Sequence, residues 1–392
     1  MALGPLSLIA TPANDDAILT LNSGSSSLKF GLYRVGSTTL DVILEGEAEA
    51  IGQEKGGFRA RAARGAVVAS ETMAIQSHRE AIERIGKLLA DADAPTPVAI
   101  GHRIVHGGPN LRRHCLIDAP VLAQIEAAAA FAPLHAPAAL AVMRFAQQRF
   151  PGVPQAACFD TAFHAEMPEV ARTLPIPLEL RAEGVERYGF HGLSCESILR
   201  QLGDNRPDRL IIAHLGNGAS ITAVKGGKSV DTSMGLTPTG GLVMGTRTGD
   251  LDPGVLLYLM REKQFDVGMI ADLVDRRSGL AGISGVSSDM RRLHEAAASN
   301  AGARLAIEMF CRSVRKQIAA MVAVLEGVDM IVFTGGIGEH DAEARANICA
   351  GLSWIGVGLD DAGARRPALV LSTREDQEIA RHARALLRRG GQ

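Results

Sequence analysis

Residues 18–33 read ILTLNSGSSSLKFGLY, and residues 210–225 read LIIAHLGNGASITAVK. In each stretch a short apolar run leads into a turn of small residues that contains glycine and serine, and a second apolar run follows. The first stretch places Leu28, Phe30 and Leu32 on one face, as the alternation of a strand requires. Each stretch therefore predicts two strands joined by a turn, and the recurrence suggests that the chain arose by duplication.

Strands and helices alternate along the rest of the chain, which predicts an α/β fold. Helical spacing of apolar residues is present over 71–91, where Ile75, Ile82, Ile85 and Leu89 recur. Further strands are predicted where QAACFD ends at Asp160 and where MIVFT spans 330–334. Further helices are predicted over about 119–130, 136–149, 195–202, 300–326 and 375–389.

The length of 392 residues predicts two domains with ample cores. We expect one domain over 1–160 and a second over 161–375, with the C-terminal helix of 376–392 packed on the first. Residues 1–16 are expected to be a loose extension. Since no Pro- or Ser-rich linker separates the halves, we expect them to meet in a cleft.

Composition excludes several classes of protein. Hydrophobic residues make up 46% and charged residues 21% of the chain, as in globular proteins. The 41 basic and 43 acidic residues give a net charge of −2, so we expect a small-molecule partner and neither nucleic acid nor membrane. No apolar run reaches the length of a membrane span.

The cysteines and the N-terminus point to a cytoplasmic location. The five cysteines are scattered and form no CxxC pair, which is typical of a reducing compartment without a disulfide framework. The first residues, MALGPLSLIATPANDD, have no basic region and only a short apolar run, unlike a signal peptide.

Three glycine-containing turns are suited to hold phosphate groups, although each is also compatible with an ordinary turn. Residues 22–29, NSGSSSLK, combine backbone N–H groups and hydroxyls with the charge of Lys29. Residues 214–220, HLGNGAS, form the second turn. Residues 333–339, FTGGIGE, lead from a strand toward a helix expected to begin near Asp341.

Familiar nucleotide-binding motifs do not fit these turns. Residues 226–229, GGKS, resemble the end of a P-loop, but Thr222 stands where GxxxxGK[ST] needs glycine. The GNGASI run lacks the last glycine of GxGxxG, and the sequence has no His-Arg-Asp catalytic loop. These differences argue against the P-loop, Rossmann and protein-kinase classes.

Charged side chains occur in four further segments next to glycines or at a strand end. The segments are GHRIVHGG (101–108), FDTAFH (159–164), YGFHG (188–192) and GTRTGD (245–250). Taken singly, each histidine or arginine is compatible with a structural role. Together, Arg103, Arg247, His191 and Asp160 are suited to the transfer of a phosphoryl group.

The motifs as a set, in this order across residues 18–381, resemble those of the acetate kinase family. They are NSGSSSLKF, GHRIVHGG, FDTAFH, YGFHG, HLGNGAS, DTSMGLTPTGGLVMGTRTGDLDP and FTGGIGE. The resemblance implies the acetate and sugar kinase/heat-shock chaperone/actin superfamily, with two duplicated ribonuclease-H-like domains, a nucleotide cleft between them and a homodimer. It also implies reversible transfer of a phosphoryl group from ATP to acetate, giving acetyl phosphate and ADP, with Mg²⁺ or Mn²⁺ as cofactor.

The resemblance also implies roles by position. Arg103 and Arg247 match the arginines that hold the carboxylate and the transferring phosphoryl group, and His191 matches the transition-state histidine. Asp160 matches the essential aspartate, which we interpret as a metal-side, orienting residue, and Asn22 and Glu375 match metal-side residues. The expected nucleotide contacts are Lys29, His214, Leu215, Gly216, Asn217, Gly218, Asp289, Met290, Arg291, Gly336, Ile337, Gly338, Glu339 and His340. The expected pocket for the methyl group consists of Val105, Leu134, Phe190 and Pro238.

Some positions depart from the family pattern. Leu193 and Cys195 stand where YGFHG is typically followed by Thr-Ser-His, Ala136 replaces the Asn of PLHNP, and His340 replaces the Asn of GIGEN. None of these changes removes a residue assigned to the chemistry. The reaction class is therefore retained, while substrate preference stays open.

The chemistry of the reaction agrees with these residues. A carboxylate acceptor is already ionised at pH 7, so the reaction needs charge neutralisation more than a strong base. Two arginines, a histidine and Mg²⁺ supply it. Two alternatives remain: a kinase for propionate or butyrate, which differs in pocket volume, and a nucleotide-binding switch without catalysis. Arg103, Arg247 and His191 argue against the switch, which needs no acyl-phosphate clamp.

Overall fold

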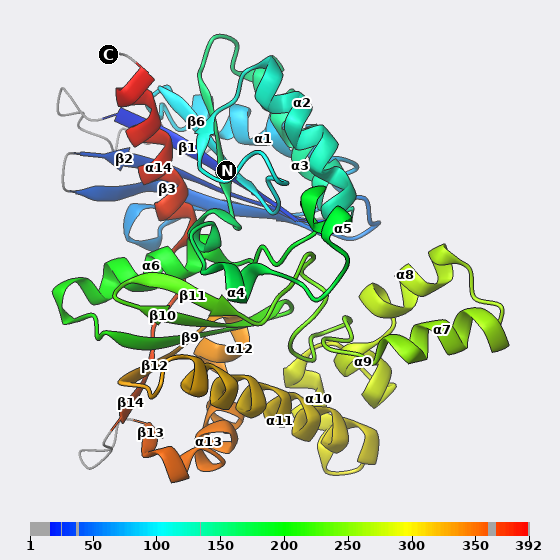
Figure 1. Ribbon diagram of the computed structural model, residues 1–392. Coiled ribbons are helices and arrows are strands. Elements are labelled where there is room, and N and C mark those ends of the chain that lie inside the picture. Colours follow the sequence, from blue (N-terminus) through cyan, green and yellow to red (C-terminus); the bar gives the residue numbers. More distant parts are fainter. Residues whose placement is uncertain (1–15, 25, 37–38, 134, 360–365, 391–392) are drawn as a thin grey trace. The chain divides into compact units, whose positions relative to one another are not determined.

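The computed structural model describes residues 16–24, 26–36, 39–133, 135–359 and 366–390 (Figure 1). The chain divides into two compact units, unit 1 (Met1–Ala162 with Arg374–Gln392) and unit 2 (Phe163–Thr373). Residues 1–15 of the extension expected over 1–16, and Leu134 of the expected methyl pocket, lie outside the described residues. Asp16, expected in the extension, instead begins the first strand.

Unit 1 is built on an eight-stranded sheet in the order β5-β4-β3-β2-β1-β6-β8-β7. Strands β1 to β5 pair antiparallel in succession, whereas β1, β6 and β8 are parallel neighbours. The strands are β1 (Asp16–Ser23), β2 (Leu28–Val35), β3 (Leu40–Glu49), β4 (Gly57–Ala62), β5 (Val67–Thr72), β6 (Ala99–Ile104), β7 (Cys115–Leu116) and β8 (Gln155–Phe159). The α-helices are α1 (His78–Asp91), α2 (Ala119–Ala127), α3 (Ala136–Arg149) and α14 (Glu375–Gly390).

Helices cover both faces of this sheet. Because successive side chains of a strand point to opposite faces, Ile18 and Leu19 of β1 belong to different core layers. Leu19 packs in a cluster with α1 and α3, represented by Ile82 and Val142, and Ile18 packs with Ala380 of α14. The red helix α14 thus lies on strands from the opposite end of the chain (Figure 1).

Unit 2 is built on a six-stranded sheet in the order β11-β10-β9-β12-β14-β13. Strands β9, β10 and β11 are antiparallel, and β9, β12, β14 and β13 are parallel. The strands are β9 (Arg209–Leu215), β10 (Ala219–Lys225), β11 (Lys228–Thr232), β12 (Met330–Thr334), β13 (Val357–Leu359) and β14 (Arg366–Val370). The α-helices are α4 (Glu169–Arg172), α5 (Leu178–Ala182), α6 (Gly192–Leu202), α7 (Pro253–Glu262), α8 (Val267–Arg276), α9 (Gly279–Ser284), α10 (Met290–Ala297), α11 (Ala301–Val324), α12 (Gly335–His340) and α13 (Ala342–Ala350).

The two sheets share one topology. The order β3-β2-β1-β6-β8 in unit 1 matches β11-β10-β9-β12-β14 in unit 2, and both contain three antiparallel strands followed by two parallel ones. The predicted α/β class and the duplication of a ribonuclease-H-like fold are therefore confirmed. None of the described helices is long and apolar enough to cross a membrane.

Several predicted element boundaries were wrong. The helix expected over 71–91 begins only at His78, because Ser77 caps it through the N–H of Glu80 and residues 67–72 form β5. Helix α6 begins at Gly192 rather than Cys195. The segment after β12 is already helical from Gly335, where a turn was expected up to Asp341.

Candidate active site

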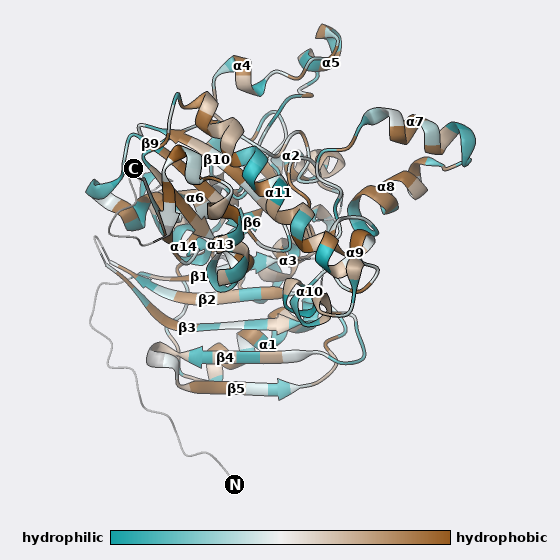
Figure 2. Cartoon of the chain, turned by 90° about the horizontal axis from the view of Figure 1, so that it is seen from below, coloured by the Kyte–Doolittle hydropathy of each residue, from teal (hydrophilic) through white to brown (hydrophobic). Residues whose placement is uncertain are grey.

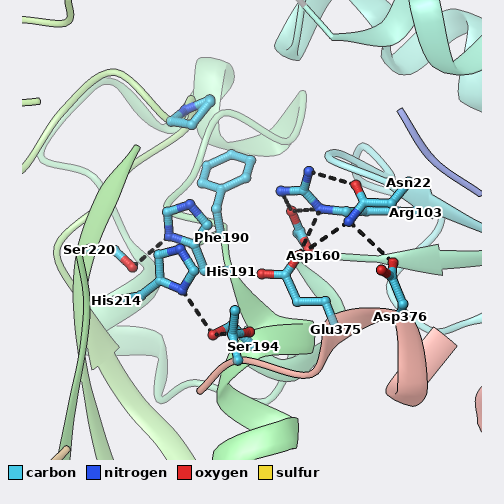
Figure 3. Close-up of polar contacts among 12 residues, drawn as sticks. Asn22, Arg103, Asp160, Phe190, His191, Ser194, His214, Ser220, Glu375 and Asp376 are labelled. Carbon is cyan, nitrogen blue, oxygen red and sulfur yellow. Dashed lines mark hydrogen bonds and ion pairs between the residues drawn. The ribbon is translucent and has the colours of Figure 1, made fainter. Parts of the chain in front are cut away.

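In unit 1, polar side chains gather where three parallel strands end. Asn22 and Arg103 are the penultimate residues of β1 and β6, and Asp160 directly follows β8. Neighbouring parallel strands end at one edge of a sheet, so these side chains meet there. Arg103 donates from Nε and Nη2 to Asp160 Oδ2 over 3.0 and 2.6 Å, and from Nη1 to Asn22 Oδ1 over 3.3 Å (Figure 3).

The ion pair of Arg103 and Asp160 is largely shielded from solvent. Asp160 is 0% exposed. Burial by itself would lower the pKa of Arg103, but the charges of Asp160 and Glu375 outweigh burial and raise that pKa. Arg103 is therefore a permanent, oriented cation, and Asp160 orients it.

Two acidic residues at the start of α14 complete this cluster. Asn22 Nδ2 donates to Glu375 Oε2 over 3.5 Å and to Asp376 Oδ1 over 3.4 Å. Burial and the neighbouring charge of Glu375 raise the pKa of Asp376 to about 6, although Lys29, Asn22 and Arg103 act in the opposite direction. Lys29 projects from β2 opposite Asn22 and is exposed.

In unit 2, His191 lies where the chain turns into α6. Its backbone is left-handed, with φ 59° and ψ 27°, which is uncommon outside glycine. Its Nδ1 is 2.9 Å from Ser220 Oγ, and its ring stacks on His214 with centroids 4.1 Å apart (Figure 3). His214 in turn has Nδ1 2.8 Å from Ser194 Oγ. The orientation of the His191 ring is thus determined by β10, β9 and α6 together.

Gly218, in the turn between β9 and β10, brings His191 and Arg247 to one point. A Cβ atom at this position would lie 3.4 Å from His191 Nε2 and 3.3 Å from Arg247 Nη1. Arg247 is held by a hydrogen bond from Nη1 to the carbonyl oxygen of Pro238 over 3.0 Å. The absence of a side chain at Gly218 therefore leaves space beside two groups that can donate to a phosphoryl oxygen.

The loops expected to bind nucleotide lie together in unit 2. Because β9 and β12 are parallel neighbours, the 214–218 turn and the first residues of α12 begin at the same sheet edge. A Cβ atom at Gly335 would lie 2.8 Å from the carbonyl oxygen of Leu215, and φ of Gly335 is +77°, so only glycine fits. Glu339 Oε1 accepts from the N–H of Gly335 over 3.0 Å, and the 336–340 segment forms most of α12.

The predicted segment 289–291 caps the neighbouring helix α10. Asp289 accepts from the N–H of Arg291 over 2.9 Å and pairs with the Arg291 guanidinium over 2.6 Å. His294 Nε2 lies 2.9 Å from Asp341 Oδ2, which ties α10 to the start of α13. Asp289, Met290 and Arg291 thus lie at the N-terminal end of α10. The same helix contacts Asp341, the residue that follows the 336–340 segment, through His294.

The described residues of the expected methyl pocket are all buried. Val105 follows β6 in unit 1, and Phe190 and Pro238 belong to unit 2. Pro238 is in direct contact with Arg247 through its carbonyl group. In the GGKS segment at 226–229, excluded above as a P-loop, Gly226 and Gly227 form the turn between β10 and β11 with positive φ, and Lys228 and Ser229 begin β11.

Three residues that contact the predicted groups were not foreseen: Asp376, Ser194 and Ser220. Asp376 stands beside Glu375 in the acidic first turn of an amphipathic helix. Acidic residues in this position indicate the N-terminus of a helix, but they do not indicate that Asp376 contacts Asn22 of β1. Ser220 lies two residues after Gly218, and its strand position makes it point toward His191. These contacts depend on pairing between distant segments.

Cys195 packs as a small apolar residue. It is 1% exposed, lies in a cluster with Ile198 and Leu210, and has Sγ 3.7 Å from Thr222 Oγ1. We expect Cys195→Ser to keep kcat within a few-fold of wild type, because a hydroxyl can bond to Thr222, and to lower stability by about 1 kcal/mol. Steady-state kinetics and thermal unfolding measure both. A loss of kcat as large as that of His191→Ala, with the fold intact by circular dichroism, would make the thiol part of the chemistry.

Comparison with known proteins agrees with this arrangement. A family model described as the acetokinase family matches residues 17–380. A protein named acetate kinase from Methylocella silvestris is 42% identical, over 94% of this chain and 98% of that protein. The crystal structure of a propionate kinase from Francisella tularensis has a TM-score of 0.87 at 38% identity and covers 95% of this chain and all of that one. The acetate kinase structure from Porphyromonas gingivalis has a TM-score of 0.83 at 35% identity, with 95% of this chain covered and 100% of that chain.

Duplicated ribonuclease-H-like units with arginine, histidine and carboxylate groups at strand ends and in the adjoining loops are typical of phosphotransferases of the acetate and sugar kinase superfamily. The chain belongs to the acetokinase family. It is therefore a kinase whose acceptor is a carboxyl group and whose phosphoryl donor in the forward direction is ATP.

Proposed function

We propose that this chain catalyses the reversible, Mg²⁺-dependent transfer of the γ-phosphoryl group of ATP to acetate, giving acetyl phosphate and ADP. The observation that carries the proposal is the convergence of His191 Nε2 and Arg247 Nη1 beside Gly218, next to His214 at the end of β9. Two donors directed at one point stabilise charge on the equatorial oxygens of a phosphoryl group in flight.

We assign the residue roles in agreement with this geometry. Arg247 and His191 donate to the transferring phosphoryl group, and Arg103, oriented by Asp160, holds the acceptor carboxylate. The residues of 161–375 bind the nucleotide through the 214–218, 289–291 and 336–340 segments. The residues of 1–160, together with the start of α14, carry the acceptor and the metal side, with Lys29 as a further contact to the nucleotide.

The oxygen atoms of unit 1 fit Mg²⁺. Asp160, Glu375 and Asp376 offer hard carboxylate ligands, the kind that Mg²⁺ prefers. A cation there would offset the burial and the repulsion from Glu375 that together raise the pKa of Asp376. Asn22 Oδ1 already accepts from Arg103, so we assign Asn22 to the metal side through water. When bound, the metal supplies charge neutralisation on the phosphate oxygens.

Acceptor selectivity tests the proposal. We expect acetate to have the highest kcat/KM, propionate about a tenth of it and butyrate at least tenfold less again, because each added methylene costs roughly 1–3 kcal/mol in a pocket that does not relax. Val105→Ala should narrow the gap between acetate and propionate, mainly through KM, because it removes two methyl groups from the wall. A coupled assay with ATP, Mg²⁺ and the three acids measures these ratios.

The results of this assay distinguish an acetate kinase from a kinase for a longer acid and from a nucleotide-binding switch. Higher kcat/KM for propionate would favour the alternative suggested by the similarity to a propionate kinase structure. Unchanged selectivity in Val105→Ala would mean that Val105 does not line the acyl pocket. ATP binding without turnover of any acid would favour the switch.

We also propose that the protein is a homodimer with α7 and α8 in its interface. These fully described helices have no buried residue and extend from the rest of unit 2, with apolar segments along both (Figure 2). Leu257 is 49% and Val267 is 75% exposed. Apolar surface of this kind is typical of a subunit interface.

The dimer is testable by sedimentation velocity. The wild type should sediment as a dimer, and the double variant Leu257→Asp, Val267→Asp should shift toward monomer because buried carboxylates oppose association. Val170→Asp, at a position 89% exposed on α4, is the matched control and should remain dimeric. A monomeric wild type at micromolar concentration contradicts the proposal.

A cytoplasmic location also belongs to the proposal. All five cysteines, each within the described residues, are free, and four of them are buried. Buried thiols without disulfides suit a reducing compartment. Cell fractionation tests this assignment, and recovery of the protein outside the cytoplasm would contradict it.

A further inference from the structure

His164 is a buried imidazole that the roles above leave unused. It is 0% exposed, and both of its ring nitrogens have polar neighbours in unit 2. Nε2 lies 2.9 Å from the carbonyl oxygen of Phe190, and Nδ1 lies 2.8 Å from Ser229 Oγ on β11. Burial lowers the pKa of His164 to about 4, so the ring is neutral near pH 7.

The neighbours determine which nitrogen of His164 carries the proton. A carbonyl oxygen can only accept a hydrogen bond, and a neutral imidazole has a single N–H. The N–H must therefore be at Nε2, where it donates to the Phe190 carbonyl. Nδ1 is then the acceptor and receives the hydroxyl hydrogen of Ser229. The ring links β11 to the peptide group that immediately precedes His191.

That peptide lies in an unusual stretch of backbone. Gly189 and His191, on either side of Phe190, both have positive φ, 73° and 59°. A Cβ atom at Gly189 would lie 2.8 Å from His164 Cγ and Cδ2, so the imidazole is packed directly against this turn. A left-handed histidine persists only where the surroundings hold it. His164 supplies a directed hydrogen bond at this point.

We propose that His164 is a positioning residue for phosphoryl transfer: through its hydrogen bond to the Phe190 carbonyl it fixes the turn that directs His191 Nε2 toward the space beside Gly218. The inference rests on the role proposed for His191. Without this hydrogen bond the turn would relax, His191 would lose its alignment, and ATP binding would be retained.

A double-mutant cycle tests the proposal. His164→Leu keeps much of the volume but cannot donate, and it is made both in the wild type and in His191→Ala. With His191 present, we expect kcat to fall about tenfold or more while KM for ATP, whose expected contacts lie outside this turn, stays within about twofold. In the His191→Ala background the same change should lower kcat by less than about twofold, because its target is gone. An equal fall in both backgrounds means a merely structural role and overturns the proposal.

Two further variants keep the test decisive if His164→Leu does not fold. His164→Gln retains an N–H that can reach the Phe190 carbonyl, so it should recover at least part of kcat relative to Leu. Ser229→Ala leaves the imidazole but removes the hydrogen bond that orients it, and its loss of kcat should also depend on His191. Additive losses in this second cycle would overturn the proposal too. A wild-type kcat in His191→Ala alone would instead refute the function proposed for His191, and this inference with it.

Discussion

Arg247→Ala is expected to lower kcat by two or more orders of magnitude while the KM for ATP changes little. Arg247 Nη1 is held by the Pro238 carbonyl over 3.0 Å and lies beside the same glycine as His191 Nε2. A donor that acts on charge developing in the transition state contributes ~3 kcal/mol or more to catalysis and little to ground-state binding. Steady-state kinetics in both directions of the reaction measures the change.

A second arginine nearby provides the matched control. Arg277 follows α8, is exposed and pairs with Asp272 over 3.0 Å. Surface pairs of this kind contribute little, so Arg277→Ala should change kcat by less than about twofold. If Arg247→Ala kept kcat within tenfold of wild type at unchanged stability, Arg247 would not be the phosphoryl-binding arginine.

Substitution of Arg103 tests catalysis less directly, because it is also expected to affect folding stability. Its removal leaves the buried Asp160 carboxylate without the guanidinium that now donates two hydrogen bonds to it. Breaking a buried pair by removing one partner costs about 3–5 kcal/mol of folding stability. We therefore expect Arg103→Ala to lose both kcat and thermal stability, whereas Arg247→Ala should lose kcat alone.

Removal of divalent metal is expected to abolish turnover completely. The acidic groups of unit 1, Asp160, Glu375 and Asp376, are hard oxygen donors, and phosphoryl transfer from ATP depends on neutralising the phosphate charge. Activity should vanish in EDTA and return with excess Mg²⁺ or Mn²⁺. Glu375→Gln should raise the Mg²⁺ concentration needed for half-maximal rate about tenfold or more, because a ligand charge is lost.

EDTA that is already saturated with Mg²⁺ serves as the control for effects of the chelator other than metal removal. It should leave the rate of phosphoryl transfer unchanged. Circular dichroism in free EDTA should show an intact fold, since both sheets are held by apolar cores. Full turnover in metal-free buffer would defeat the magnesium assignment.

Strands whose residues are mostly buried were predictable from the sequence, and the more polar strands β4 and β5 were not. β1 and β2 bury most of their residues, so their apolar patterns stand out in the sequence. The fully described β5, VVASET, has no buried residue, and its apolar residues do not alternate with polar ones as those of a half-buried strand do. β4, GFRARA, does alternate, with Phe58 and Ala60 buried, but the arginines between them give the segment a basic rather than an apolar character.

Boundaries depended on single capping residues. Ile75 fits the helical spacing of α1 yet lies before the helix, because the Ser77 side chain accepts the N–H of Glu80 and starts the helix there. The glycines after β12 suggested an extended turn, but Gly335 takes the positive φ that allows α12 to begin at once. Propensity alone did not resolve either case.

The sequence by itself determined the α/β class, the duplicated strand-turn-strand units and the chemical types gathered in the loops, because apolar alternation and glycine turns are local properties. Only the tertiary structure decided which side chains meet. Asn22, Arg103 and Asp160 join one hydrogen-bond network because β1, β6 and β8 are parallel neighbours. Asp376 joins them because α14, from the far end of the chain, packs on the same sheet, and such long-range pairing leaves no periodic signal in the sequence.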